Sequence, residues 1–258
     1  MQDIYNDLKK LSEQEIPAVL CLVTNTSGST PRKAGSKMLV LGDGSIKGTI
    51  GGGSVEFQVI QDALKLLTTG EPMVKTYHLE DDLQMHCGGT MQVYFEGIGC
   101  SPKLYIFGGG HIGKALAGYA YGLGFSPTVF DQRNGIFDSW ELDLPGIETR
   151  IGNYLQIIEK TIFDKNSYIV IVTPKHEFDE TILLACAPCE YAYLGMIGSK
   201  RKVAEIRNKA LENNVLTAEI LSKIDMPIGL PFAAETPAEI AISIAAKMID
   251  VKNTLKKS

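Results

Sequence analysis

The residues with the clearest chemical use form a glycine-rich loop. Gly108, Gly110 and Gly113 directly follow an apolar run at 104–107, in GxGxxG spacing, and open a helical pattern. In such a loop the first glycine permits a tight turn, the second lets backbone approach a phosphate, and the third lets helix and strand pack closely. The helix N-terminus then offers its amide groups to an anion. The spacing therefore predicts a phosphate-binding site.

Two polar residues belong to this predicted site. Asp131 ends the next apolar run, about 20 residues downstream, where a carboxylate can bond the 2′-hydroxyl of a ribose. His111 stands inside the loop, either as a ligand contact or as an ordinary loop histidine. Strand, loop, helix and acid in this order predict a Rossmann-type unit. The alternative is a glycine-rich β–α turn that binds no ligand.

Three loops in the N-terminal part of the chain carry a second group of candidates. These are Arg32, Lys33, Lys37, Gly52, Gly53, Ser54, Glu56, Cys87 and Gly88. Basic side chains and amides at a helix start suit a phosphate, and a loop cysteine suits sulfur or metal chemistry. The same residues are equally consistent with solvated lysines, turn glycines and one packed cysteine. Spacing alone leaves both interpretations open.

Polar residues also follow the strongly apolar run at 168–173. His176 and Asp179 come directly after it, and a second polar loop at 195–202 follows the next predicted strand. Ligands of doubly wound sheets bind outside the carboxyl ends of the strands, so these residues are candidates for the same site. Neither a Ser–His–Asp arrangement, a metal-ligand spacing nor the GxxxxGK[ST] loop of nucleotide triphosphatases is present.

The elements that position these residues indicate an α/β protein with two domains. Alternation of strands and helices over 103–258 predicts a Rossmann-like, doubly wound parallel sheet with both faces covered. Residues 1–97 alternate short strands with two helices and predict a mixed α+β domain. In the helix after the glycine loop, the 3.6-residue period predicts a shared face. Its members are Ile112, Leu116, Tyr119 and Leu123.

Composition narrows the class of protein. The 258 residues are 45% apolar and 21% charged, with a net charge of −5, which argues against binding dominated by nucleic-acid phosphates. The sequence has neither an apolar run of membrane-spanning length nor a signal-peptide pattern at its start. Its five cysteines, an odd number, suggest reduced thiols. We therefore expect a cytoplasmic protein without membrane or nucleic-acid partners.

The same motifs resemble, in order, the XdhC/CoxI family. Members of this family are maturation factors of xanthine dehydrogenase and related molybdenum hydroxylases. The matching segments are residues 28–38, 51–56, 87–90, 107–113, 173–179, 195–202 and 227–241. The resemblance covers nearly the whole chain. It implies an XdhC-type N-terminal domain followed by a Rossmann-like domain.

The resemblance also implies a function. Family members bind the molybdenum cofactor, protect it while a cysteine desulfurase supplies its terminal sulfur ligand, and deliver it to an apo molybdenum hydroxylase. By this resemblance Arg32, Lys33 and Lys37 would hold the anionic cofactor. Some relatives carry cysteine where this chain has Ser54, which leaves Cys87 as the expected sulfur contact. A homodimer that is not itself a catalyst is expected.

A function of another class remains an alternative. The second choice is an NAD(P)-dependent oxidoreductase acting on a small molecule, which the glycine loop and Asp131 also allow. Asp131 favours NAD, whereas Arg133 leaves the 2′-phosphorylated form open. A third possibility is a Rossmann protein that senses a nucleotide without chemistry.

Overall fold

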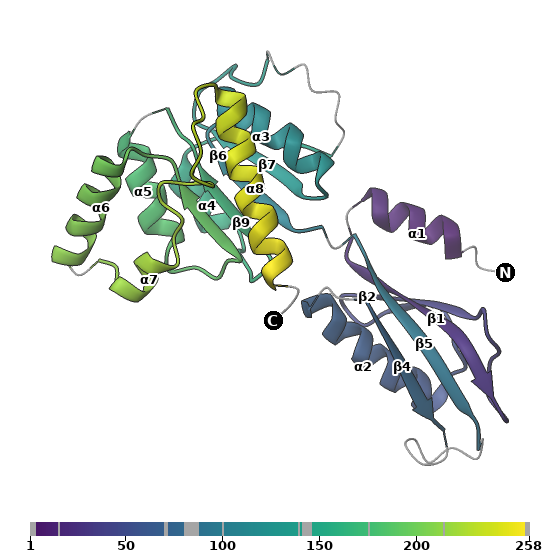
Figure 1. Cartoon of the computed structure of the whole chain (residues 1–258). Helices are drawn as coiled ribbons and strands as arrows, with labels where there is room; N and C mark the ends of the chain where they lie inside the picture. The colour runs from purple at the N-terminus through teal and green to yellow at the C-terminus, as the bar shows by residue number, and fades with distance from the viewer. Residues whose placement is uncertain are drawn as a thin grey trace. The chain divides into compact units, whose positions relative to one another are not determined.

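A computed structural model describes most of the chain. It covers residues 4–14, 16–69, 72–79, 88–99, 101–138, 140, 146–174, 176–213 and 215–255, without the side chains of 68, 69, 176 and 177. The chain divides into two compact units, Met1–Cys100 and Ser101–Ser258, here called unit 1 and unit 2 (Figure 1). Among the described residues, no helix combines the length and apolarity that a membrane span requires.

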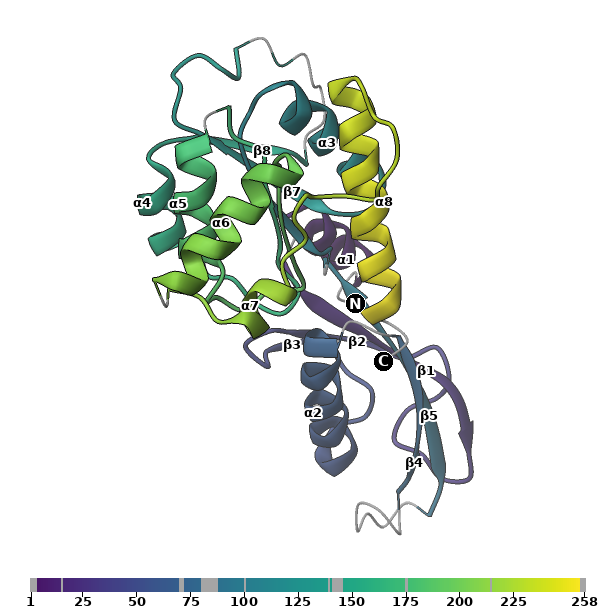
Figure 2. The ribbon, with the colours of Figure 1, turned by 60° about the vertical axis from the view of Figure 1, so that its left-hand side comes forward.

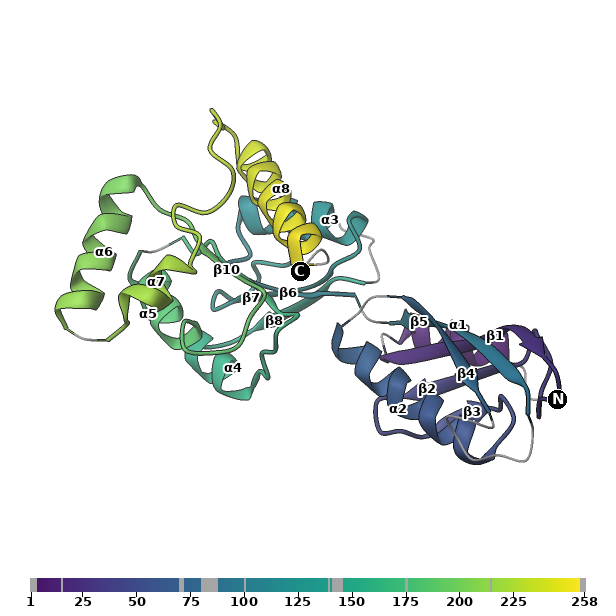
Figure 3. The ribbon, with the colours of Figure 1, turned by 60° about the horizontal axis from the view of Figure 1, so that its bottom comes forward.

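Unit 1 is an antiparallel sheet with a helix on each face. The strand order is β3-β2-β1-β5-β4. The strands are β1 Ala18–Ser27, β2 Lys37–Leu41, β3 Ile46–Gly48, β4 Met73–His78 and β5 Thr90–Ile98, and the helices are α1 Ile4–Glu13 and α2 Gly53–Thr69. Side chains alternate along a strand. Met38 and Val40 therefore pack with α2, whereas Leu39 packs with α1. The two helices lie on opposite faces of the sheet (Figure 3).

Unit 2 is a parallel sheet with the strand order β10-β9-β6-β7-β8. The strands are β6 Lys103–Phe107, β7 Ser126–Asp131, β8 Glu148–Ile151, β9 Tyr168–Ile171 and β10 Tyr193–Met196. The helices are α3 His111–Gly122, α4 Tyr154–Lys160, α5 His176–Cys186, α6 Lys200–Glu212, α7 Ala218–Ser222 and α8 Pro237–Leu255. Counted along the unit this is the 3-2-1-4-5 order of a doubly wound sheet. The predicted fold class is confirmed.

Both faces of the unit 2 sheet are covered, as its apolar strands require. Phe107 points into a core with α4, α5 and α6, while the adjacent Ile106 points into a core with α3 and α8. Helices α3 and α8 lie side by side on that second face (Figures 1 and 2). The short helix α7, capped by Thr217, was not predicted from the sequence.

The predicted face of α3 is partly wrong. Leu116 is buried as expected, but Tyr119 and Leu123 are 40% and 38% exposed. The remaining buried residues of this helix are Gly113, Ala117 and Ala120. Because α3 packs against both the sheet and α8, most of its inner side consists of small residues that allow close approach, and Tyr119 and Leu123 lie toward solvent.

Two glycines make this close approach possible. Gly108 has φ +122°, and a Cβ there would lie 2.4 Å from the carbonyl oxygen of Val172. A Cβ on Gly113 would lie 1.9 Å from the carbonyl oxygen of Gly108. Both obstacles are backbone atoms, which cannot rotate aside as a side chain can. The turn from β6 into α3 therefore requires glycine at both positions.

We expect Gly113→Ala to destabilise unit 2 by about 3 kcal/mol or more, because overpacking against backbone forces the helix away from β6. Gly122→Ala is the matched control in the same helix. A Cβ at Gly122 meets nothing within 4 Å, so this change should be neutral or stabilise by up to about 1 kcal/mol.

Urea unfolding followed by tryptophan fluorescence measures both variants. The single tryptophan of the sequence, Trp140, lies in unit 2 and packs edge-on against Phe137 at 5.0 Å between ring centroids. Equal unfolding free energies for the two variants would contradict the packing described above.

Candidate functional site

The glycine loop of unit 2 is open at one position. Gly110 is the N-cap of α3, and because it has no side chain, no N-cap group accepts a hydrogen bond from the first N–H groups of the helix. A Cβ at Gly110 would have Arg133 Nη2 as its nearest neighbour, at 4.0 Å. His111, the first residue of α3, is exposed. The loop thus crowds its backbone at Gly108 and Gly113 and leaves room at Gly110, the division expected of a phosphate loop.

Asp131 lies beside this loop at the end of β7 and is only 1% exposed. Its Oδ2 accepts hydrogen bonds from the Gly109 N–H at 2.8 Å and from Arg133 Nη2 at 2.7 Å. Its Oδ1 accepts from the backbone N–H and the Nε of Arg133, both at 2.9 Å. The carboxylate that was predicted to bind a ribose therefore accepts hydrogen bonds from Gly109 and Arg133 instead. The Arg133 side chain is half-exposed and lies on the solvent side of the carboxylate.

The ion pair between Asp131 and Arg133 shifts the pKa values of both side chains. Burial works to raise the pKa of Asp131, but the hydrogen bonds from Arg133 and Gly109, with the charge of Arg133, outweigh it and lower that pKa. The hydrogen bond to Asp131 raises the pKa of Arg133 in turn. Both groups are therefore charged near neutral pH.

Asp179, another predicted site residue, is a buried counter-ion. It is fully buried in α5 and accepts hydrogen bonds from the Thr173 hydroxyl at 2.5 Å and the Thr173 N–H at 3.2 Å. Lys202 Nζ donates to it at 2.8 Å, from a side chain that is 12% exposed. This pair joins α5 to the first turn of α6. Contact of Asp179 with a ligand stays a prediction that requires this pair to open. His176 begins α5, but its side chain lies outside the described residues.

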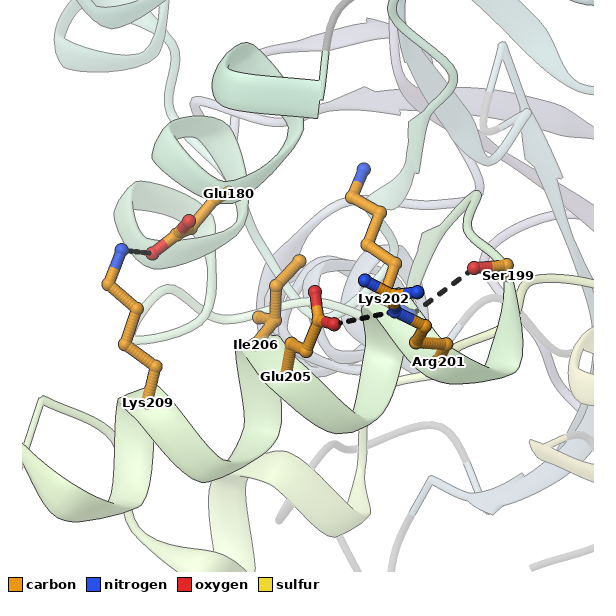
Figure 4. A pocket seen from close by; sticks show the side chains of 7 residues that line it. All are labelled: Glu180, Ser199, Arg201, Lys202, Glu205, Ile206 and Lys209. Atoms are coloured by element: carbon orange, nitrogen blue, oxygen red, sulfur yellow. Dashed lines mark hydrogen bonds and ion pairs between the residues drawn. The ribbon is translucent and has the colours of Figure 1, made fainter.

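A pocket of about 640 Å³ lies next to this ion pair, between α5 and α6 (Figure 4). The residues that line it are Glu180, Ser199, Arg201, Lys202, Glu205, Ile206 and Lys209. Arg201 pairs with Glu205 at 2.9 Å and Lys209 with Glu180 at 2.5 Å. Because carboxylates on the same walls bind Arg201 and Lys209, this pocket is not a simple anion site.

Unit 1 brings the three predicted loops together. A Cβ at Gly51 would lie 2.5 Å from Pro31 Cγ, so the loop before α2 touches the loop of Arg32. A Cβ at Gly89 would lie 2.3 Å from the Ser29 carbonyl oxygen, so the segment entering β5 touches the same loop. Gly88 is exposed beside this contact. Cys87 lies outside the described residues.

The basic residues of these loops differ in how accessible their charged groups are to a ligand. Arg32 and Lys33 have exposed side chains, while their carbonyl groups accept hydrogen bonds from Thr30 Oγ1 at 2.9 Å and Ser36 Oγ at 2.8 Å. Their backbone is fixed and their charge faces solvent. Lys37 is half-buried, donates to the Gly35 carbonyl at 3.0 Å and lies 5.4 Å from the centre of the Tyr5 ring. Arg32 and Lys33 are therefore the accessible cations.

Glu56 binds the loop that precedes α2. Its Oε2 accepts hydrogen bonds from Thr49 Oγ1 at 2.5 Å, Ile50 N at 3.1 Å and Gly52 N at 3.2 Å. The Glu56 carboxylate thus binds backbone amides of the loop that was predicted to bind a ligand. These hydrogen bonds fix the conformation of the glycine loop. Ser54 is exposed in the first turn of α2, next to Gly53, and no atom lies within 4 Å of a Cβ built on Gly52.

Family models match both units of the chain. The XdhC Rossmann domain matches residues 104–248, which is more than half of the chain, and the XdhC and CoxI family matches residues 11–78. The chain belongs to the XdhC and CoxI family. The family resemblance of its motifs is confirmed.

Two curated proteins are similar to the chain. The chain is 33% identical over 256 residues to the uncharacterized protein YqeB of Escherichia coli, covering 97% of the chain and 46% of YqeB. It is 27% identical over 180 residues to a Bacillus subtilis protein named as a probable xanthine dehydrogenase subunit, covering 69% and 50% of the two proteins. This family member thus spans about half the length of the curated relatives it matches.

A solved structure shares the fold. A Bacillus halodurans protein described as a xanthine dehydrogenase superposes with a TM-score of 0.53 over 98% of this chain and 96% of its own, at 21% identity. At this identity the likeness shows the fold alone.

Two features of this family member were underestimated from the sequence. Arg133 was named only as an alternative, although the Asp-x-Arg spacing places a guanidinium within reach of the acid. Glu56 was expected near a ligand, whereas it binds its own loop. In the sequence, a glutamate four residues after Gly52, at a helix start, is the signal for such a bond to backbone amides.

We expect Asp131→Asn to lower the stability of unit 2 by about 2 kcal/mol at pH 7, because hydrogen bonds to a charged group are lost. The folded-state pKa of Asp131 lies below its unfolded value, so its contribution is present above that unfolded value of about 3.9. It is lost as the pH falls through the folded pKa. The stability difference between wild type and variant should therefore shrink on acidification, as measured by Trp140 fluorescence. A constant difference down to pH 2 would contradict this account.

We expect Lys202→Met to cost about 3–5 kcal/mol, because it removes the Lys202 ammonium group from the fully buried carboxylate of Asp179. Lys209→Met is the matched control, because Lys209 also lies on α6 and also pairs with a carboxylate of α5. Its pair with Glu180 is exposed, so the loss should stay below about 1 kcal/mol. Chemical unfolding of both variants measures the contrast, and similar losses would show that burial does not decide the strength of these pairs.

Proposed function

We propose that this chain is an accessory protein of a xanthine dehydrogenase-type molybdenum hydroxylase. In this role it binds the molybdenum cofactor, assists its sulfuration and passes it to the apo-enzyme. Membership of the XdhC and CoxI family supports the accessory role, as does the Bacillus subtilis relative with its xanthine dehydrogenase name. The chain acts by binding and transfer in this proposal, with no catalytic residue of its own.

The observation that carries the proposal is the meeting of three loops around Arg32 in unit 1. The molybdenum cofactor is a pterin with a phosphate and a sulfur-bound metal, so its carrier needs cations for the phosphate and a place for the metal end. Arg32 and Lys33 are exposed on a fixed backbone and would bind the phosphate with charge-assisted hydrogen bonds. Ser54 and the open Gly52 would border the same cargo.

The residues fit an anionic cargo with one restriction. The amides of Ile50 and Gly52 already donate to Glu56, so the phosphate would rely on the two side chains and on the start of α2 beyond Gly52. Lys37 would act through the loop, because its ammonium group donates to Gly35. Cys87 remains the proposed sulfur contact. Further proposals are a cysteine desulfurase as the sulfur source and a homodimer as the working form.

We expect the double variant Arg32→Ala/Lys33→Ala to bind the cofactor at least about tenfold more weakly, because it loses charged donors to the phosphate. Anaerobic calorimetry with isolated molybdenum cofactor measures this. Lys9→Ala/Lys10→Ala is the matched control, since it removes the same charge from exposed positions on α1 of the same unit. Equal weakening in both double variants would mean that only net charge matters. Absence of cofactor binding by the wild-type chain would overturn the proposal.

The oxidoreductase alternative makes a different demand. It requires turnover of a small molecule with net reduction or oxidation of a nicotinamide nucleotide, whereas a carrier binds its cofactor in a fixed ratio to protein. Absorbance at 340 nm during incubation with candidate substrates would reveal such turnover. Stoichiometric cofactor uptake without turnover supports the carrier.

A further inference from the structure

The carboxyl end of β7 is the position that a Rossmann sheet offers to the adenosine ribose. In the 3-2-1-4-5 order the nucleotide lies across the carboxyl ends of the strands, with its phosphates at the first glycine loop. The acid that ends the second strand then meets the ribose 2′ position. In unit 2 that strand is β7 and that acid is Asp131.

Asp131 does not present its carboxylate to this position. Each of its oxygens accepts two hydrogen bonds, all from Gly109 and Arg133, and the side chain is 1% exposed. A ribose hydroxyl could reach it only after the Arg133 side chain had moved away. That movement would break two charge-assisted bonds that are 2.7 and 2.9 Å long.

Arg133 presents a cation at the same position. Its fork to Asp131 uses Nε and Nη2, so Nη1 takes no part in the pair, and the side chain is 45% exposed. Nη2 also borders the open Gly110, 4.0 Å from where a Cβ would stand. A guanidinium held in this way by a buried carboxylate is preorganised for a second anion, since its planar fork matches phosphate oxygens.

We propose that Arg133 determines the nucleotide specificity of unit 2, favouring an adenine nucleotide with a phosphate on the ribose 2′ oxygen over one with a free 2′-hydroxyl. Asp131 is then a positioning residue that acts through Arg133. The 2′-phosphate binds the exposed side of the guanidinium and leaves the Asp131 fork intact. The 2′-hydroxyl of an unphosphorylated ribose has no accessible carboxylate to bind, so it adds little binding free energy. This site consists of unit 2 residues, whereas the proposed cofactor loops belong to unit 1, and the inference does not rest on the proposed function.

Calorimetry with four probes tests the inference on the full chain. NADP⁺ is compared with NAD⁺, and adenosine 2′,5′-bisphosphate with adenosine 5′-diphosphate, which carries the same number of phosphates at another place. We expect NADP⁺ and the 2′,5′-bisphosphate to bind about tenfold or more tightly than their partners, the size of one charged hydrogen bond. Arg133→Ala should abolish this preference.

The matched control is Arg150→Ala. Arg150 pairs with Glu148 at the same two-residue spacing and the same 2.7 Å distance, but this pair is exposed on β8, at the edge of the sheet. It should leave the preference unchanged. Because Arg133→Ala strands a buried carboxylate, the double variant Asp131→Asn/Arg133→Gln is measured beside it, with Trp140 fluorescence as the check on folding. It should also lose the preference.

Four results would overturn the inference. They are equal or tighter binding of NAD⁺, equal binding of the two adenosine phosphates, an unchanged preference in folded Arg133 variants, and no binding of any probe. Tighter NAD⁺ binding that depends on Asp131 would show that Arg133 swings aside and the acid meets the ribose. None of these results bears on molybdenum cofactor binding by unit 1, so the two proposals fail separately.

Discussion

The structure of unit 2 depends on backbone contacts that leave no space for a side chain. Gly108 lies against the carbonyl of Val172, and Gly113 lies against the carbonyl of Gly108. These contacts fix the distance between β6, β9 and the start of α3. The amide of Gly108 also donates to Phe130 at 2.8 Å, which ties the turn to the end of β7. Only with the turn in this position does the Gly109 amide reach Asp131.

In both units, a carboxylate beside the glycine loop is hydrogen-bonded to the loop, and a neighbouring arginine is exposed to solvent. Carboxylates that lie at predicted ligand positions, Glu56 in unit 1 and Asp131 in unit 2, bind amides of their own glycine loops. Arginines beside those loops, Arg32 and Arg133, expose their guanidinium groups at least in part. A buried or half-buried carboxylate is costly unless it is hydrogen-bonded, and in both units the nearest loop amides donate to it. The surfaces left for a ligand are therefore cationic in both units.

This division of charge is consistent with a family member that handles phosphate-bearing molecules. Exposed cations on a fixed backbone bind an anion without a large loss of side-chain freedom in the loop. Buried pairs such as Asp179 and Lys202 hold the surrounding segments in place, because breaking them strands a charge. In both proposals, ligand binding and loop stability thus rest on different residues.

The fold class and the family could be predicted from the amino-acid sequence alone. The GxGxxG spacing, the apolar strands and their alternation with helices depend on local periodicity and on glycine chemistry, both of which can be read from neighbouring residues. The ordered motifs over nearly the whole chain identified the XdhC and CoxI family.

The packing of the folded chain determines which side chains face solvent. It placed Tyr119 outward, because α8 packs against the small-residue side of α3. Tertiary structure also decided which charges are free to meet a ligand. Lys202 pairs with Asp179 across 23 positions of the chain, and the Gly109 amide reaches Asp131 across 22 positions. No local pattern specifies such partners, because they depend on how strands and helices are brought together in the folded sheet. The sequence therefore named the loops of both candidate sites, and the packing of the sheet and helices determined which of their side chains remain exposed.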